Sequence, residues 1–118
     1  ASDACLVLLR KDEIFKTVIP SKMLEFMSCA RPVILGVDGQ ARRIIEEAQA
    51  GVCIVPENAD ELAREVLRLA SDPQLRENLG RNGRRHILQH FARRQTALSY
   101  LEVLNRLLGK EKPRAAAA

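Results

Sequence analysis

The chain has 118 residues, of which 47% are hydrophobic and 29% are charged, a size that suits one hydrophobic core and excludes two ordinary domains. With three Phe, one Tyr and no Trp, the core must be aliphatic, and aromatic platforms that stack on bases or sugars are not expected. The formal net charge of +4 suits a phosphate-bearing small ligand without requiring a nucleic acid.

The sequence shows no pattern for a membrane span, a disulfide framework or a metal site. Its longest apolar run, residues 4–9, is too short to cross a membrane and does not form a signal peptide. The three cysteines lie in apolar runs without Cys-x-x-Cys spacing, which predicts reduced core thiols in a cytosolic protein. His86 and His90 are four residues apart with no third ligand nearby, so we expect them to lie along one helix rather than to bind zinc.

Three short apolar segments predict the strands of a parallel sheet. They are residues 4–9, 32–37 and 51–55, each bounded by Pro, Gly or charged residues, as is typical of strands buried on both faces. Helical patterns separate them, at residues 21–31 and 40–50. The alternation of strand and helix predicts an α/β fold with right-handed crossovers.

The sequence after the third strand is helical. Residues 60–71 place apolar side chains at helical spacing behind a polar start, which predicts a third helix. Apolar positions continue at multiples of four over residues 75–91, where Gly80 and Gly83 predict a bend or a helix end.

A last helix is expected at residues 93–108, with a wide apolar face and its end at Gly109. We expect one domain over residues 1–109 and a disordered tail over residues 110–118. Since an open parallel sheet normally has five or six strands, the expected fold is a three-layer Rossmann-like half domain. It has a short parallel sheet of about three strands flanked by helices, with a helical C-terminal portion, and corresponds to the second half of a nucleotide-binding domain.

The start of the helix at residues 21–31 is the first candidate binding site, because ligands of such sheets bind beyond the carboxyl ends of the strands. Ser21 is a helix-start residue, Lys22 falls in the first turn and Glu25 follows one turn later. A cation at a helix N-terminus suits a diphosphate, and a carboxylate suits the vicinal hydroxyl groups of a ribose. The alternative is that Ser21 caps the helix and Glu25 offsets its dipole, although their spacing of four does not fit a capping box.

The loop that follows the second predicted strand is the second candidate. It holds Gly36, Asp38 and Gly39 and opens the next helix, and two glycines permit close backbone approach to a phosphate or a hexose. The alternative interpretation is ordinary turn chemistry.

Two further classes of function compete with nucleotide binding. An arginine cluster would suit a nucleic acid or another anionic polymer, although an ordinary solvated amphipathic helix explains it as well. The cluster consists of Arg76, Arg81, Arg84, Arg85, Arg93 and Arg94. The other class is a non-catalytic nucleotide-binding or assembly domain that forms a homodimer through an exposed sheet edge.

Residues 20–69, which begin PSKMLEFMSCARPVILGVDG, and residues 72–91 carry a resemblance to a known family. They resemble the donor-binding domain of family 4 glycosyltransferases with the GT-B fold, and more narrowly the bacterial surface-polysaccharide branch that has Pro-Ser-Lys before its motif glutamate. The resemblance covers residues 3–108, which are similar to the last three strands and helices of the second of two Rossmann-like domains.

The resemblance implies donor-binding roles for particular residues. Glu25 corresponds to the second glutamate of the family's Glu-x7-Glu motif, which binds the ribose hydroxyl groups of the donor. The first glutamate would fall at Thr17 and is therefore missing. Ser21 and Lys22 stand where the family approaches the diphosphate, and the Gly39 loop is similar to one that lies near the sugar or phosphate.

The resemblance implies transfer of a hexosyl or N-acetylhexosaminyl group from a nucleotide diphosphate sugar, most often a UDP-sugar, to a glycan or lipid-linked acceptor with retention of configuration. It implies no metal and no cofactor. The implied partners are the donor and an acceptor domain preceding this chain, without nucleic acid. The implied location is the cytoplasm, with the parent enzyme peripheral at the inner face of the cytoplasmic membrane. No catalytic residue is expected in this chain, so it should be inactive alone.

Overall fold

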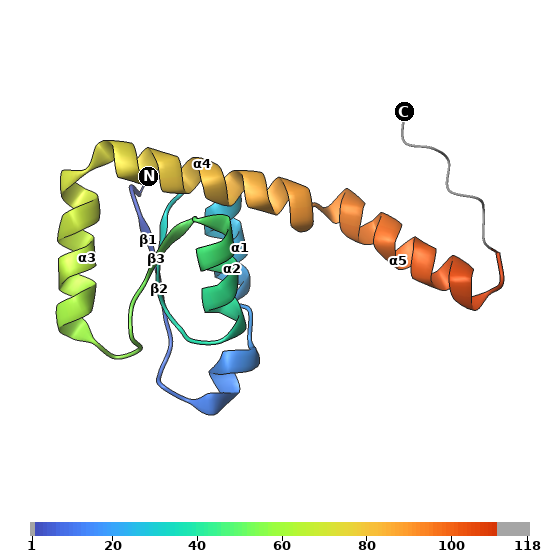
Figure 1. The fold of residues 1–118 in the computed structure, drawn as a ribbon, viewed down its shortest axis with the longest axis horizontal. Helices are drawn as coiled ribbons and strands as arrows, with labels where there is room; N and C mark the ends of the chain where they lie inside the picture. The colour runs from blue at the N-terminus through green and yellow to red at the C-terminus, as the bar shows by residue number, and fades with distance from the viewer. Residues whose placement is uncertain (1, 111–118) are drawn as a thin grey trace.

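The computed structural model describes residues 2–110 and is built on a three-stranded parallel sheet (Figure 1). The strands are β1 (Cys5–Leu8), β2 (Val33–Gly36) and β3 (Gly51–Cys53), and their order in the sheet is β1-β2-β3. Both pairs of neighbouring strands are parallel, so the sheet predicted from the three apolar segments is confirmed.

Helices cover the sheet from both sides and make a three-layer α/β fold, as predicted (Figure 1). One face carries α1 (Ser21–Ser28) and α2 (Gln40–Ala48), and the other carries α3 (Ala59–Ser71). Because strand side chains alternate between faces, Leu35 packs in the cluster under α1 and α2, whereas Ile34 packs in the cluster under α3.

The prediction that every strand is buried on both faces is right for β2 and wrong for β1, and the residues of β3 are only partly buried. All residues of β2 are buried, whereas in β1 Val7 is buried but Leu6 and Leu8 remain 50% and 45% exposed. The reason is the position of α3, which packs over β2 and leaves the same face of β1 uncovered within the described residues. β1 is therefore an edge strand with one open apolar face.

Helix α4 (Pro73–His90) runs across the end of the sheet at which the strands begin (Figure 1). It passes through Gly80 and Gly83 without interruption, so the predicted bend or helix end is wrong. A Cβ atom at Gly80 would lie 2.2 Å from the carbonyl oxygen of Ala30, after α1. Gly80 is thus required for the close approach of two backbones rather than for a turn.

Replacing Gly80 by Ala is expected to destabilise the fold by about 1 to 3 kcal/mol, because a methyl group would overlap rigid backbone. Gly83→Ala is the matched control in the same helix. A Cβ atom there would meet the side chains of Ala50 at 3.1 Å and Met27 at 3.4 Å, tight contacts that a small shift relieves, and the roughly 1 kcal/mol gain in helix propensity opposes their cost. Urea unfolding followed by circular dichroism measures both. Equal losses in the two variants would contradict this account of Gly80.

Helix α5 (Arg93–Leu107) confirms the last predicted helix to within one residue, and Gly109 follows it with a φ of 65°. The helix extends away from the sheet (Figure 1), and within residues 2–110 its apolar face is not buried. The predicted tail lies outside the described residues except for Lys110.

One element was not predicted, the 3-10 helix η1 (Glu13–Thr17) between β1 and α1. The side chain of Asp12 accepts a hydrogen bond from the N–H of Ile14 at 3.0 Å and caps it. The hydroxyl of Thr17 donates to the carbonyl oxygen of Ile14 at 3.0 Å. Asp12 as a helix-start residue was the signal that could have predicted this turn.

Candidate functional site

The carboxyl ends of the three strands and the N-termini of the following helices meet at one edge of the molecule, at the bottom of Figure 1. A cleft of about 290 Å³ opens there between η1 and the loop that follows β2. Its lining combines positive, negative and apolar side chains: Arg10, Lys11, Asp12, Glu13, Phe15, Lys16, Val37, Asp38 and Pro56. This is the edge at which open parallel sheets bind their ligands.

Some of the charged groups in the cleft are already paired. The ammonium group of Lys16 lies 2.7 Å from a carboxylate oxygen of Glu13, and this hydrogen bond raises the pKa of Lys16. The carboxylate of Asp12 is engaged by the backbone of η1. Within residues 2–110, the side chains of Arg10 and Lys11 take part in no ion pair, so two positive groups at the cleft are available to an anionic ligand.

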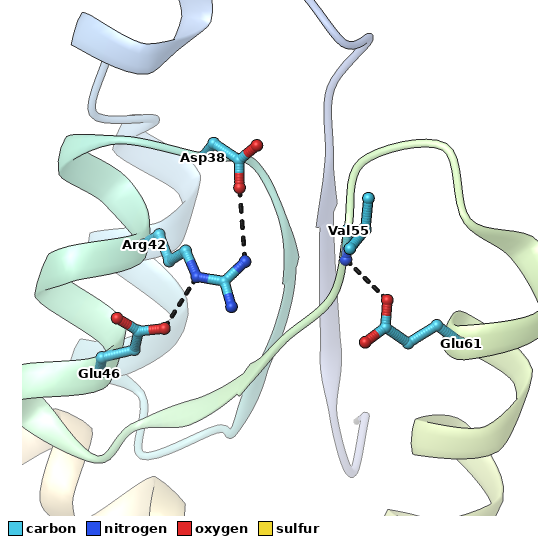
Figure 2. A network of polar contacts seen from close by, with 5 residues as sticks. All are labelled: Asp38, Arg42, Glu46, Val55 and Glu61. Carbon is cyan, nitrogen blue, oxygen red and sulfur yellow. Dashed lines mark hydrogen bonds and ion pairs between the residues drawn. The ribbon is translucent and has the colours of Figure 1, made fainter.

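Asp38 belongs to a chain of ionic contacts along the first turns of α2 (Figure 2). The guanidinium of Arg42 donates to Asp38 at 3.4 Å and, through Nε, to Glu46 at 2.8 Å. The bond to Glu46 is the main reason that the pKa of Arg42 is raised. Arg42 is therefore held firmly on α2 by Glu46 and contacts Asp38 more loosely.

Glu61 lies on α3, on the other side of the sheet, and bonds to the backbone rather than to another charged group (Figure 2). Its carboxylate accepts a hydrogen bond from the N–H of Val55 at 2.8 Å, while its own N–H donates to the side chain of Asn58, the residue before α3. These bonds join the end of β3 to the start of α3 and stabilise that side of the edge.

Gly39 brings the loop after β2 against η1. Its backbone has φ 83° and ψ −134°, which only glycine adopts readily. A Cβ atom there would lie 2.0 Å from the carbonyl oxygen of Lys16. Gly39 also precedes α2 without a side-chain cap, so the N-terminus of α2 keeps free N–H groups close to the cleft.

Ser21, Lys22 and Glu25 lie outside the cleft lining, and Gly39 adjoins that lining next to Asp38 without being part of it. Pro20 is the N-cap of α1 and no side chain caps the helix, so the alternative in which Ser21 caps it is wrong. Ser21, Lys22 and Glu25 are all exposed to solvent. Among the described residues no hydrogen bond or ion pair engages the carboxylate of Glu25, which leaves it able to bind a ligand.

Sequence reasoning thus named Gly39, next to the cleft, but did not name the side chains that line the cleft. The structure brings Gly39, Asp38 and the residues of η1 together, because the positive φ of Gly39 folds the loop onto Lys16. The signal for Asp38 was present in the Gly-Val-Asp-Gly sequence, but the basic residues after β1 follow no recognisable motif.

The arginine cluster, which lies on α4 and at the start of α5, is partly occupied by structural contacts. Arg84 donates to the carbonyl oxygen of Ser28 at 2.7 Å, Arg76 donates to the carbonyl oxygens of Leu69 and Ala70, and Arg81 bonds Asn78. Arg76 and Arg84 thus tie α4 to α3 and α1, whereas the Arg81 bond lies within α4. All these contacts leave a smaller free charge for an anionic polymer.

The cysteines and histidines make no metal site in the part of the chain that is described. All three cysteines are free, but Cys29 is exposed, so the prediction of core thiols is wrong for it. Burial raises the pKa of the Cys53 thiol to about 11, which keeps that thiol protonated at neutral pH. His86 and His90 both lie on α4, as predicted, and their ring centroids are 4.5 Å apart. The pKa of His86 is lowered, mainly by burial and to a smaller extent by the charge of His90.

The geometry is that of an α/β domain with a cleft at the carboxyl edge of its parallel sheet, the edge at which such sheets bind ligands. The model of the family "Glycosyl transferases group 1" matches residues 3–86, and the chain belongs to this family. The match includes both candidate regions, Ser21–Glu25 and the Gly39 loop. No curated protein matches the chain.

Among solved structures, the chain is similar to sucrose-phosphate synthase from Thermosynechococcus elongatus, with 26% identity and a TM-score of 0.71. The match covers 79% of this chain and 23% of that protein, so the chain spans less than a quarter of its relative. The fold is that of a GT-B glycosyltransferase half domain. Within residues 2–110, none of the helices has the length and apolar character that a membrane crossing requires.

Proposed function

We propose that this chain is the donor-binding part of a retaining glycosyltransferase of family 4, of the bacterial surface-polysaccharide branch. The enzyme transfers a hexosyl or N-acetylhexosaminyl group from a UDP-sugar to a glycan or lipid-linked acceptor. The observation that carries the proposal is the glycosyltransferase family match over residues 3–86, which spans the whole carboxyl edge of the sheet.

Each proposed donor-binding residue has a chemical role. Glu25 accepts hydrogen bonds from the ribose hydroxyl groups, and its carboxylate is exposed and unengaged among the described residues. Ser21 and Lys22 bind the diphosphate at the uncapped N-terminus of α1. Gly39 lets the loop backbone lie close to the donor.

The chemistry we propose needs no metal ion. Departure of the nucleoside diphosphate is stabilised by fixed N–H groups and by cations, as in other sites that are preorganised for a developing negative charge. The uncapped N-termini of α1 and α2, together with Arg10 and Lys11, are the groups in this chain that suit that role. An acceptor domain preceding this chain in the full-length polypeptide supplies the rest of the site, so the chain alone is inactive. The enzyme works in the cytoplasm, peripherally at the inner face of the membrane.

Isothermal titration of the full-length polypeptide that contains this chain tests the proposal. UDP and at least one of UDP-glucose, UDP-galactose and UDP-N-acetylglucosamine are expected to bind, and the affinity is expected to persist after treatment with EDTA. GDP and GDP-mannose serve as controls for the base. If none of these nucleotides and nucleotide sugars binds, donor binding is refuted. If binding is lost after EDTA, the metal-independent site is refuted.

The open face and edge of β1 favour a second candidate, a non-catalytic assembly domain. Leu6 and Leu8 are half exposed on an edge strand that pairs only with β2 among the described residues. A homodimer through this edge would cover them. Size-exclusion chromatography at several concentrations, together with Leu8→Lys, distinguishes the candidates, because a dimer that dissociates in this variant supports the assembly domain.

A further inference from the structure

We propose that Asp38 binds a hydroxyl group of the donor sugar and that Arg42 positions the Asp38 carboxylate for this contact. The inference rests on the proposed function and adds the residue that recognises the transferred sugar. Three features at one cleft support it: the Asp38 carboxylate has a single long contact, the loop that carries it packs closely on η1, and Arg10 and Lys11 take part in no described ion pair.

The backbone that carries Asp38 is held in place. The neighbouring Gly39 packs so closely on the carbonyl oxygen of Lys16 that no Cβ atom fits between them. On the other side, Val37 is buried in the core under α1 and α2. Asp38 therefore stands between two anchored residues, at the wall of the cleft.

The carboxylate of Asp38 keeps most of its capacity to accept hydrogen bonds. A carboxylate offers about four lone-pair sites, and the described contacts of Asp38 comprise one long contact of 3.4 Å from Arg42. Its side chain is 36% exposed, so a ligand can reach it. Arg42 is in turn bonded to Glu46 at 2.8 Å (Figure 2), which keeps its guanidinium group beside the Asp38 carboxylate.

Asp38 is the acidic group in the cleft that is best placed to accept from a ligand. Among the described contacts, Asp12 caps η1 and Glu13 pairs with Lys16, whereas Asp38 has only the long contact with Arg42. A carboxylate repels phosphate and accepts from hydroxyl groups, so the part of a nucleotide sugar that fits beside it is the sugar. The unpaired Arg10 and Lys11 line the same cleft and suit the adjacent diphosphate.

Isothermal titration with the full-length polypeptide tests the inference by comparing UDP with UDP-glucose, UDP-galactose and UDP-N-acetylglucosamine. We expect at least one of these sugars to increase affinity over UDP. Asp38→Asn is expected to reduce that affinity about tenfold, while the affinity for UDP changes less than about twofold. Arg42→Gln is expected to reduce it in the same selective way, and Arg42→Lys to restore part of it. The matched control is Asp3→Asn, an exposed carboxylate at the opposite edge of the sheet.

The outcomes separate the two proposals. If UDP binds but no sugar adds affinity, or if Asp38→Asn lowers the affinities for UDP and UDP-sugar equally, the inference is wrong and the proposed function stands. If neither nucleotides nor nucleotide sugars bind to the wild type, the proposed function fails and the inference fails with it. Thermal unfolding of each variant confirms folding, and Asp38→Ser replaces Asp38→Asn if the latter does not fold.

Discussion

Replacing Glu25 by Gln is expected to weaken UDP binding by the full-length polypeptide about 5- to 150-fold, which corresponds to about 1 to 3 kcal/mol. A carboxylate accepts two ribose hydroxyl bonds with its negative charge, whereas an amide offers one carbonyl oxygen and turns a donor toward the second hydroxyl. Glu25 is exposed and unengaged among the described residues, so its replacement removes no bond that stabilises the fold. The loss is therefore expected in binding and not in the urea midpoint.

The matched control for Glu25 is Glu47→Gln. Glu47 is also exposed, but it lies in the last turn of α2, at the edge of the sheet opposite the cleft. Isothermal titration with UDP is expected to show wild-type affinity for this variant. Equal affinities for the Glu25 and Glu47 variants would remove Glu25 from the donor site. A further comparison uses 2′,3′-dideoxy-UDP, whose affinity should be insensitive to the Glu25 substitution because the hydroxyl groups are absent.

Gly39→Ala is expected to reduce the free energy of unfolding by about 2 to 4 kcal/mol. Two costs combine in this variant. Alanine is strained at φ 83° and ψ −134°, and its Cβ atom would lie 2.0 Å from the carbonyl oxygen of Lys16, which is backbone and cannot rotate away. Relief of the overlap requires the loop after β2 to move away from η1, and that movement opens the cleft. Urea unfolding followed by circular dichroism measures the loss.

Gly109→Ala is a comparison variant without the overlap. Gly109 also has a positive φ, 65°, but a Cβ atom there would meet nothing within 4 Å, so only a strain of about 1 to 2 kcal/mol applies. A larger loss is expected for the Gly39 variant, because the overlap with Lys16 adds to a backbone strain that is itself greater at ψ −134°. If the two variants lose the same stability, the loop does not pack on η1 in solution.

The arrangement of the sheet could be predicted because each strand is a short apolar run between helical patterns. In β2, Val33–Gly36, every residue is apolar or glycine and every residue is buried, so pattern and burial agree. In β1 the same pattern predicted burial on both faces, but Leu6 and Leu8 are half exposed because α3 does not cover their side of the strand. An apolar run predicts a strand, but burial on each face depends on which helix covers it.

The role of a glycine is also hard to predict from the sequence alone. Gly80 is a helix breaker by propensity, and its place inside α4 becomes clear only when the carbonyl oxygen of Ala30 is seen 2.2 Å from where a Cβ atom would lie. Close approach between segments some fifty residues apart leaves no local trace in the sequence. The close approach of Gly39 to Lys16 beside the cleft likewise leaves no local trace in the sequence.

The amino-acid sequence by itself determined the α/β class, the order of the elements and the choice of Ser21, Lys22, Glu25 and Gly39 as candidates, because these depend on periodicity and on helix-start chemistry. Only the tertiary structure decided that the cleft lies between η1 and the loop after β2, with Asp38 loosely held at its wall. The physical reason is that a cleft depends on backbone packing and side-chain pairing between separate segments, which no single segment encodes.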